Sequence, residues 1–441
     1  MSPDAATVVD ELVQALLGAQ LPAGIRCWDG SHIEGPAGSP TLVVNSPRAL
    51  RRFMYSPNEL GLARAYVSGD LDIEGDLYEA LSLPDALAAR PELSTDRMAV
   101  ARSLKAFSRL GVLGPPPAPP AEESRLSGMR HSIRRDRQAI THHYDVGNDF
   151  YRILLGPSMV YSCAYFDTPQ ASLDSAQYAK LELICRKLDL KPGMRLLDVG
   201  CGWGSLALHA AEHHGVDVVG VTISQAQADL ARKRSSELGL TDKVDIRLQD
   251  YREVSDGPYD AISSIGMAEH VGSDKLADYA SGLHALLNPG GRLLNHAITR
   301  GPAAGPDRPT KKSFLWRYVF PDGELQPLST HVGILEEAGF EVRDVEALRL
   351  NYALTCRAWV ANLEAEWDRA VSLTSEGRAR VWRLYLAGSA LAFEARRLGV
   401  NQVLAVKAST ISSPFDSENL ANVPLRRPNW EPAAKVGAGT S

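Results

Sequence analysis

Short apolar runs alternate with longer amphipathic segments from residue 194 onward, and this alternation limits the folds open to the chain. Each run is long enough for only one strand, and several runs end at glycine or aspartate, as buried strands commonly do. The expected strands lie at residues 194–200, 216–224, 244–250, 259–266, 291–298, 340–348 and 402–409. Helices between the first five predict an α/β fold with a mostly parallel, seven-stranded sheet covered on both faces. Ligands of such sheets bind beyond the carboxyl ends of the strands.

A proline-rich segment, GPPPAPPAEES at residues 114–124, divides the chain. Consecutive prolines cannot continue a helix or a central strand, and they favour an extended spacer. We therefore predict a small N-terminal α+β domain at residues 1–113, suited to lipid binding or dimerisation. The main domain should cover residues 125–425, followed by a flexible tail at 426–441.

Two local expectations complete this outline. In the N-terminal domain, a strand at residues 41–46 should precede a helix at residues 47–68, which starts at the cap-like Ser46-Pro47 pair. In the main domain, a helical insertion at roughly residues 355–398 should separate the last two strands. Its apolar and aromatic side chains would pack helix on helix or cover a site.

Composition and charge argue against several classes of protein. The 441-residue chain has a formal net charge of -6, which argues against a general nucleic-acid binder. It begins without a secretory-signal pattern, and no run approaches the ~20 apolar residues of a spanning helix. The five cysteines are odd in number and show no zinc-site spacing. We expect a cytoplasmic protein with reduced thiols and no metal site.

The first strand of the sheet runs into a glycine-rich loop, DVGCGWG at residues 198–204. Glycines let the backbone approach a ligand closely, and the following helix offers free N–H groups. Asp198 is placed to hold a cationic amino group. A dinucleotide site would need GxGxxG and a carboxylate after the second strand, but that strand ends in Thr222-Ile-Ser224. The difference favours S-adenosylmethionine over NAD.

Other segments are more specific than this loop. In chain order the motifs are HHYDVGNDFY (142–151), MVYSCAYF (159–166), LLDVGCGWG (196–204), SIGMAEHVG (264–272) and NHAI (295–298). Together they resemble the cyclopropane-fatty-acid synthase family, which includes the mycolic acid cyclopropane synthases and methyl-branched fatty acid methyltransferases. The resemblance covers about residue 125 to the end of the sheet. It extends weakly into ELGLARAYVSGDLDIEG, which resembles the extra domain of synthases that act on membrane phospholipids.

The resemblance implies a class I methyltransferase fold and an S-adenosylmethionine-dependent transferase of class EC 2.1.1. In the reaction of the family, the double bond of an unsaturated acyl chain attacks the activated methyl, and a carbocation forms on the chain. A base then removes a proton. By motif matching, the cofactor-binding residues are Tyr144, Asp145, Tyr161, Asp198, Gly200, Gly202, Gly204, Thr222, Gln227, Tyr251, Arg252 and Gly266.

The family uses a bound bicarbonate ion as the base, and the resemblance also assigns its ligands. Glu269, His296 and Tyr352 match the side-chain ligands, and the backbone at Cys163 and Ile298 completes the cradle. A carboxylate beside an anion is reasonable if one of the two carries a proton, or if His296 is charged. Taken alone, each of these residues would more often be an ordinary surface or core residue.

The sequence departs from the family pattern at two positions. Ala268 stands where phenylalanine usually precedes the glutamate, and Ser389 stands where a cysteine is often found. The smaller side chain beside Glu269 leaves two products open. One is a cyclopropane, and the other is a methylene branch, which a separate reductase would convert into a methyl branch.

A run of basic residues predicts contact with a membrane. It comprises Arg125, Arg130, His131, Arg134, Arg135 and Arg137. Arginines near an anionic bilayer contribute roughly 1 kcal/mol each. We expect reversible, peripheral binding at the inner face of the membrane, a phospholipid substrate with an unsaturated acyl chain, and a homo-oligomer that does not bind nucleic acid.

Two other functions are weighed against this one. A methyltransferase for a small amine or a sterol would need a polar or differently shaped acceptor site. A cofactor-binding or lipid-binding protein without catalysis would have no use for the complete set of Glu269, His296 and Tyr352.

Overall fold

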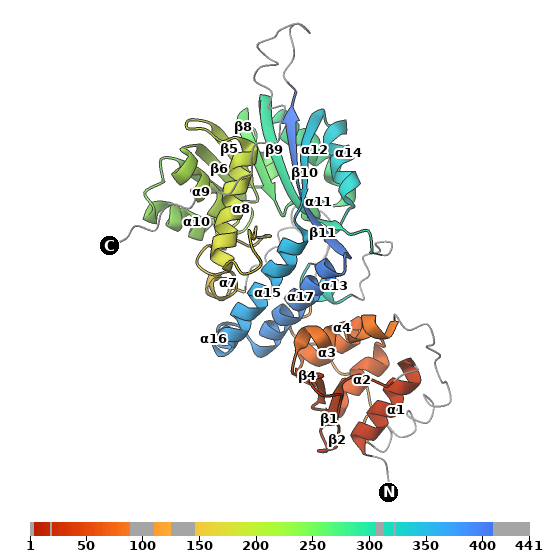
Figure 1. Ribbon diagram of the computed structural model, residues 1–441. Coiled ribbons are helices and arrows are strands. Elements are labelled where there is room, and N and C mark those ends of the chain that lie inside the picture. The colour runs from red at the N-terminus through yellow and green to blue at the C-terminus, as the bar shows by residue number, and fades with distance from the viewer. Residues whose placement is uncertain are drawn as a thin grey trace. The chain divides into compact units, whose positions relative to one another are not determined.

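The computed structural model of the protein describes residues 4–17, 20–88, 110–124, 146–304, 313–320 and 323–408. Its contacts define two compact units, and each unit is drawn from separate parts of the chain. The N-terminal unit takes in residues 1–125, 310–321 and 363–391, as far as these are described. The sheet unit takes in residues 126–309, 322–362 and 392–441, with the same restriction. Each unit has its own β-sheet (Figure 1).

The sheet unit is built on seven strands in the order β10-β11-β9-β8-β5-β6-β7. The strands are β5 (Arg195–Val199), β6 (Asp217–Thr222), β7 (Val244–Leu248), β8 (Tyr259–Ile265), β9 (Leu287–Arg300), β10 (Phe340–Ala347) and β11 (Leu398–Lys407). Neighbours among β5 to β9 pair in parallel, whereas β11 is antiparallel to both β9 and β10. All seven expected strands are present, and the predicted mostly parallel sheet is confirmed.

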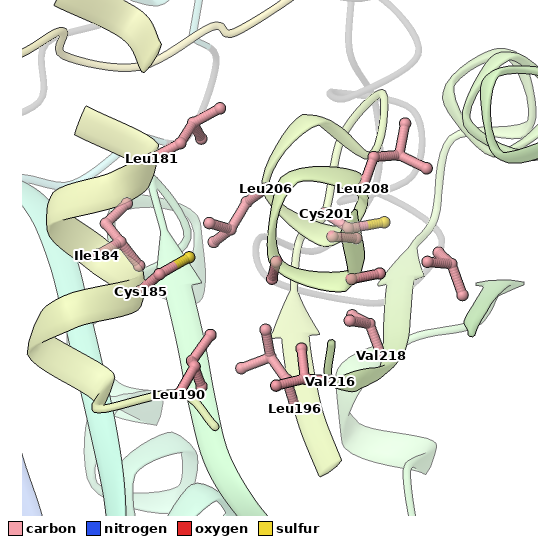
Figure 2. Packing of buried hydrophobic residues seen from close by; sticks show 14 of the residues in the cluster. Leu181, Ile184, Cys185, Leu190, Leu196, Cys201, Leu206, Leu208, Val216 and Val218 are labelled. Atoms are coloured by element: carbon pink, nitrogen blue, oxygen red, sulfur yellow. The ribbon is translucent and has the colours of Figure 1, made fainter. Parts of the chain in front are cut away.

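Helices cover both faces of this sheet. On one face, α8 (Leu173–Leu188), α9 (Ser205–His214) and α10 (Gln225–Glu237) close an apolar core that includes Ile184 and Leu206 (Figure 2). On the other face, α12 (Leu276–Ala285) and α14 (Leu328–Glu337) contribute to a second apolar core. Strands buried on both faces explain why their sequences read as nearly continuous apolar runs.

The N-terminal unit contains a four-stranded sheet in the order β2-β1-β3-β4. These strands are β1 (Gly24–Cys27), β2 (His32–Ile33), β3 (Thr41–Val44) and β4 (Leu71–Glu74), and helices α1 (Ala5–Leu17) and α4 (Leu77–Ala88) belong to the same unit. Strand β3 confirms the strand expected at residues 41–46. Ile25, Val44 and Ala65 lie in the core of the unit.

The single helix expected at residues 47–68 is wrong, because two helices occupy this stretch. They are α2 (Pro47–Tyr55) and α3 (Glu59–Val67). Pro57 lies between them and lacks the N–H that would continue a helix. The side chain of Asn58 then accepts hydrogen bonds from two backbone N–H groups of α3 and caps it.

The proline-rich segment forms neither helix nor strand, as expected, but its backbone is held rather than free. Arg52 donates a hydrogen bond to the carbonyl of Ala118 at 2.8 Å, and the Tyr55 hydroxyl donates to the carbonyl of Gly114 at 2.9 Å. These bonds tie the segment to helix α2 of its own unit.

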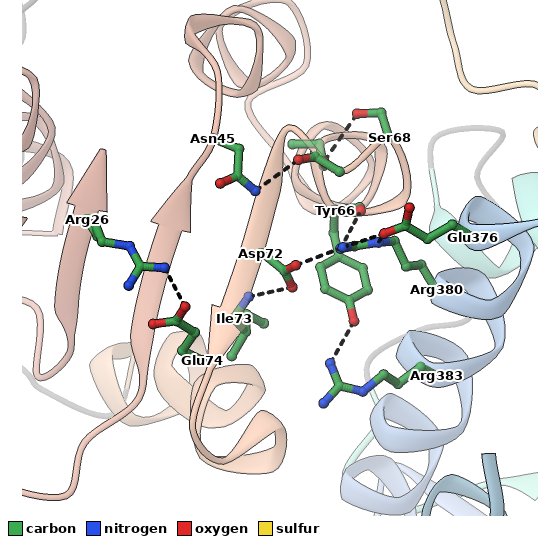
Figure 3. Close-up of polar contacts among 12 residues, drawn as sticks. Arg26, Asn45, Tyr66, Ser68, Asp72, Ile73, Glu74, Glu376, Arg380 and Arg383 are labelled. Carbon is green, nitrogen blue, oxygen red and sulfur yellow. Dashed lines mark hydrogen bonds and ion pairs between the residues drawn. The ribbon is translucent and has the colours of Figure 1, made fainter. Parts of the chain in front are cut away.

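The helical insertion between β10 and β11 comprises α15 (Arg349–Ala365), α16 (Trp367–Leu373) and α17 (Glu376–Glu394). Residues 363–391 of this insertion group with the N-terminal unit. In Figure 3, Arg380 pairs with Asp72 at 2.7 Å, and Arg383 donates to the hydroxyl of Tyr66 at 2.9 Å. The grouping by contacts therefore differs from the predicted main domain at 125–425, and the roles of the two domains stay predictions.

Among the helices of the described ranges, none is long and apolar enough to cross a bilayer. The basic run at residues 125–137 and the predicted tail at 426–441 lie outside the described residues.

Candidate active site

The loop between β5 and α9 requires glycine at two positions. Gly200 has φ +76°, and a Cβ there would lie 2.5 Å from the sulfur of Met267. Gly204 has φ +79° and begins helix α9, and a Cβ there would lie 3.0 Å from Ala231. Glycine tolerates this backbone conformation and has no Cβ to clash. The loop can therefore turn tightly at the carboxyl end of β5, where ligand binding was expected.

Asp198, the last but one residue of β5, is 2% exposed. Its Oδ1 accepts a hydrogen bond from the Ser263 hydroxyl at 2.8 Å, whereas Oδ2 is buried with no partner among the described residues. Burial raises the pKa of Asp198 to about 6. A buried carboxylate oxygen without a partner fits the ammonium group of the cofactor, because a cationic donor would satisfy it.

A cavity beside this loop is lined by most of the residues predicted to bind the cofactor. They are Tyr161, Asp198, Gly200, Gly202, Thr222, Gln227, Tyr251, Arg252 and Gly266. Gly204 is not in the lining and serves as the start of α9. Tyr144 and Asp145 lie outside the described residues.

The lining also includes residues that were not predicted, among them Lys180, Trp203 and Asp250. Lys180 is 2% exposed and donates to the Ser162 hydroxyl at 2.9 Å, and burial lowers its pKa to about 8. Asp250 accepts hydrogen bonds of 2.8 and 2.7 Å from the guanidinium of Arg252. Asp250 could have been found, since it follows the third strand at the ligand edge. Lys180 carried no such signal, because a helical lysine is normally solvated.

Glu269 lies in the short helix α11 (Ala268–Val271), which follows β8. Its Oε1 accepts a hydrogen bond from the backbone N–H of Ile298 at 2.6 Å. Its Oε2 is buried and has no partner in the described part of the chain. Burial raises the pKa of Glu269 to about 7, against the lowering effect of the Ile298 N–H. Near neutral pH this carboxyl group can therefore either hold or accept a proton.

His296 lies on β9, opposite Gln402 of β11. The Gln402 amide nitrogen is 3.3 Å from Nδ1 of the imidazole, while Nε2 is buried without a partner among the described residues. Burial lowers the pKa of His296 to about 3, so the ring is neutral at physiological pH. Because an amide nitrogen can only donate, Nδ1 of the neutral ring accepts from Gln402, and Nε2 carries the proton as a donor. Of the two states considered for this site, a protonated carboxyl fits better than a charged histidine.

Aromatic rings connect the cofactor loop to Tyr352. We call this chain of rings the aromatic row; it comprises Trp203, Tyr151, Tyr161, Trp359, Tyr352 and Phe393. Neighbouring ring centroids are 4.7 to 6.0 Å apart, which is contact distance. Tyr352 and Trp359 are 7% and 1% exposed, so the row is largely dry.

Two further positions singled out in the sequence, Cys163 and Ala268, are both buried. Cys163 is fully buried, its sulfur lies 3.6 Å from the carbonyl of Leu348, and burial raises the pKa of its thiol well above the usual value. The thiol therefore has no nucleophilic role here, in line with a function through the backbone. Ala268 is 3% exposed and packs in the apolar core on the α12 face. Its side chain is absent from the lining of the cofactor cavity.

The strand order, the antiparallel β11 and the glycine loop after β5 together define the class I methyltransferase fold. A family model described as mycolic acid cyclopropane synthetase matches residues 131–403. The chain belongs to this family and is an S-adenosylmethionine-dependent transferase, as the sequence predicted.

Two similar proteins match nearly the whole chain, and a third matches a little over half of it. A probable fatty acid methyltransferase of Pseudomonas putida is 42% identical over 90% of this chain and 95% of its own length. A probable fatty acid methyltransferase of Mycobacterium tuberculosis is 41% identical over 94% and 96%, respectively. The cyclopropane-fatty-acyl-phospholipid synthase of Escherichia coli K12 is 40% identical over 59% of this chain and 66% of its own length.

Solved structures agree with this assignment. The crystal structure of mycolic acid cyclopropane synthase CmaA1 complexed with SAH and CTAB is 35% identical, with a TM-score of 0.58. The match covers 62% of this chain and 98% of that one. The cyclopropane synthase MmaA2 of Mycobacterium tuberculosis gives the same TM-score at 33% identity, covering 63% and 99%.

Proposed function

We propose that this enzyme transfers the methyl group of S-adenosylmethionine to the double bond of an unsaturated acyl chain in a membrane phospholipid. The relatives named above, two probable fatty acid methyltransferases and a cyclopropane-fatty-acyl-phospholipid synthase, support this substrate class. The observation that carries the proposal is the pair of unsatisfied buried atoms, Oε2 of Glu269 and Nε2 of His296. Buried polar groups usually have hydrogen-bond partners. Two buried polar atoms without partners at the carboxyl end of the sheet therefore indicate a binding site for a polar ligand.

The chemistry explains why such a site has to be dry. An alkene is a weak nucleophile and carries no proton to lose first, so catalysis depends on proximity and on stabilising the cation that forms. The electron pair of the double bond forms a bond to the methyl carbon as the bond from that carbon to sulfur breaks. Positive charge then develops on the neighbouring carbon of the chain. The faces of the aromatic row attract such a charge.

Bicarbonate fits the unsatisfied atoms as the bound base. Its negatively charged oxygens accept hydrogen bonds, and His296 Nε2–H and a protonated Glu269 carboxyl would each donate one. When bound, bicarbonate supplies a basic oxygen that can take the proton from the transferred carbon. Tyr352 and the backbone at Cys163 would complete the cradle. The backbone at Ile298 would belong to the cradle as well, and its N–H also positions Glu269 by donating to Oε1.

Loss of that proton can lead to two products. If the C–H electron pair forms a bond to the cationic carbon, a cyclopropane ring closes. If a hydride first shifts along the chain, the same electron pair forms an exocyclic methylene, which a separate reductase would have to reduce. Because Ala268 packs in the core, Ala268→Phe would overpack that core and destabilise the protein by about 1–3 kcal/mol. The product is therefore better determined on the unmodified enzyme.

The test is mass spectrometry of the acyl chains of a host that expresses the protein and is fed labelled methionine. We expect one labelled carbon on the unsaturated chains of phospholipids, as a ring or as a branch. Label in a small amine or a sterol instead would favour the alternative acceptor and contradict the proposal.

We also propose peripheral membrane binding at the inner, cytoplasmic face, through the basic run at residues 125–137, and a homo-oligomeric enzyme. Replacing Arg130, Arg134 and Arg135 with glutamine should weaken binding to anionic vesicles, and salt should weaken it in the wild type. The control is a triple variant in which the exposed Lys191, Lys233 and Arg369 are replaced with glutamine, which changes the net charge by the same amount. Equal binding by both triple variants would remove this part of the proposal.

A further inference from the structure

Away from the cofactor cavity, helices α8 and α9 bring a thiol, two imidazoles and a carboxylate together. One donor atom from each of Cys185, His209 and His214 lies within 4.8 Å of the other two. Oε2 of Glu182 lies 3.4 Å from Nε2 of His209 and 3.1 Å from Nε2 of His214. We call these four residues the Cys-His-Glu cluster. Glu182 and Cys185 are three residues apart on α8, so they share a face of that helix.

The cluster is closed on one side and open on the other. Cys185 is fully buried in the apolar core between α8 and α9, where its sulfur points away from α8 (Figure 2). His209 is 6% exposed, whereas the side chains of His214 and Glu182 are 17% and 21% exposed. An ion could therefore enter past His214 and Glu182 and meet the thiol at the inner end.

Ion pairing alone accounts for only part of this arrangement. Glu182 also accepts a hydrogen bond from Arg186 at 2.7 Å, which explains why the carboxylate is ionised and ordered. It does not account for the Cys185 thiol, which is not part of the ion pairs and whose sulfur lies within 4.8 Å of a nitrogen of each imidazole. A soft sulfur, two imidazoles and a nearby carboxylate are the donor types that zinc prefers.

We propose that the Cys-His-Glu cluster binds a zinc-like divalent cation, with Cys185, His209 and His214 as ligands. Glu182 is then the positioning residue that orients both imidazoles, as carboxylates commonly do around zinc. This site differs from the expectation of no metal site. Its ligands come from two separate helices, so the sequence contains no short cysteine motif that would indicate it. The same two helices supply Lys180, Leu181, Ser205 and Leu206 to the cofactor cavity, so the cation would clamp its walls together.

The full-length protein, stripped of metal by a chelator, is titrated with Co²⁺ and followed by absorption. We expect one equivalent to bind and to give a thiolate-to-cobalt charge-transfer band, which Zn²⁺ then removes by displacement. A hundredfold excess of Zn²⁺ over its Kd should raise the Tm by roughly 5–10 °C. Absence of stoichiometric binding, or binding without the charge-transfer band, would overturn the proposal.

Variants assign the ligands. Cys185→Ala should abolish the band, whereas Cys356→Ala, which removes another buried thiol of the same unit, should leave it intact. Glu182→Gln should weaken Co²⁺ binding about 10- to 100-fold, and the neighbouring His213→Gln should not change it. A band that survives Cys185→Ala, or that Cys356→Ala removes equally, would contradict the assignment. Should Cys185→Ala fail to fold, the wild-type titration and the Glu182→Gln affinity still decide the matter.

Discussion

Oε1 of Glu269 accepts a 2.6 Å hydrogen bond from the backbone N–H of Ile298, and this bond orients a carboxyl group whose other oxygen is buried without a partner among the described residues. The bond connects α11, which follows β8, to the neighbouring strand β9. It therefore sets the carboxyl group at the edge of the sheet where ligands bind. The raised pKa of about 7 makes Glu269 the most sensitive reporter of this site.

The pH dependence of stability should reveal Glu269. Its pKa rises from 4.5 to about 7 on folding, so ionisation is harder in the folded state. Its contribution to stability is complete below pH ~4.5 and is lost as the pH rises to about 7. Relative to wild type, Glu269→Gln should gain up to about 3 kcal/mol in free energy of unfolding over this range. Denaturant titrations at each pH measure it, with the exposed Glu237→Gln as control. Parallel curves for wild type and Glu269→Gln would contradict the assignment.

Asp198 should control the affinity for S-adenosylmethionine. Asp198→Asn removes the charge that we propose to pair with the ammonium group, and a hydrogen bond to a charged group is worth about 1.5–3 kcal/mol. We expect the Kd to rise about 10- to 100-fold in calorimetry. Since the pKa of Asp198 is about 6, wild-type affinity should also fall as the pH drops below 6. Asp256→Asn, at a half-exposed position outside the cavity, is the control. An unchanged Kd for Asp198→Asn would exclude this role.

Two properties of Gly200 should be required: its backbone conformation at positive φ and the absence of a Cβ. Gly200→Ala places a Cβ 2.5 Å from Met267, whereas Gly239→Ala, at a similar φ of +67°, meets nothing within 4 Å. Both substitutions should destabilise the protein by about 1–2 kcal/mol, because both force alanine into a left-handed conformation. Only Gly200→Ala should also impair cofactor binding. Equal affinity in the two variants would mean that the close approach is unimportant.

The sequence predicted the sheet well because strand periodicity and glycine turns are local signals. The division of residues 47–68 into two helices was also local, at Pro57 and Asn58, but the apolar pattern on both sides concealed it. The grouping of residues 363–391 with the N-terminal unit was not predictable, because it depends on pairs such as Asp72 with Arg380 that are 308 positions apart.

The candidate site shows the same contrast. The glycine loop is a short motif that could be recognised by its spacing, and the Glu269 segment could be recognised by its resemblance to a family motif. Arg234 could not, although it donates to the carbonyl of Trp203 at 2.6 Å and so holds the cofactor loop from helix α10. A charged residue on an amphipathic helix gives no sign of whether it faces solvent or a backbone carbonyl.

Tyr352 should affect turnover rather than cofactor binding. Tyr352→Phe keeps the ring that stacks on Phe393 at 4.7 Å and removes only the hydroxyl. If that hydroxyl holds the base, kcat should fall about 100-fold, as it does when one donor to a reacting anion is lost. Single-turnover rates and calorimetry separate the two effects. Tyr259→Phe, which removes a hydroxyl bonded to Asp256, is the control. A kcat that stays normal in Tyr352→Phe would remove the residue from the cradle.

The most direct test of the central claim is a deuterium count. Purified enzyme receives S-adenosylmethionine with a fully deuterated methyl group and vesicles of a phospholipid with unsaturated acyl chains, and the acyl products are weighed by mass spectrometry. Proton loss from the transferred carbon predicts that two of its three deuterium atoms remain, for either a ring or a methylene product, and that Glu269→Gln forms little product. Products that keep all three deuterium atoms, or label that never reaches the acyl chain, would contradict methyl transfer to an alkene with a bound base.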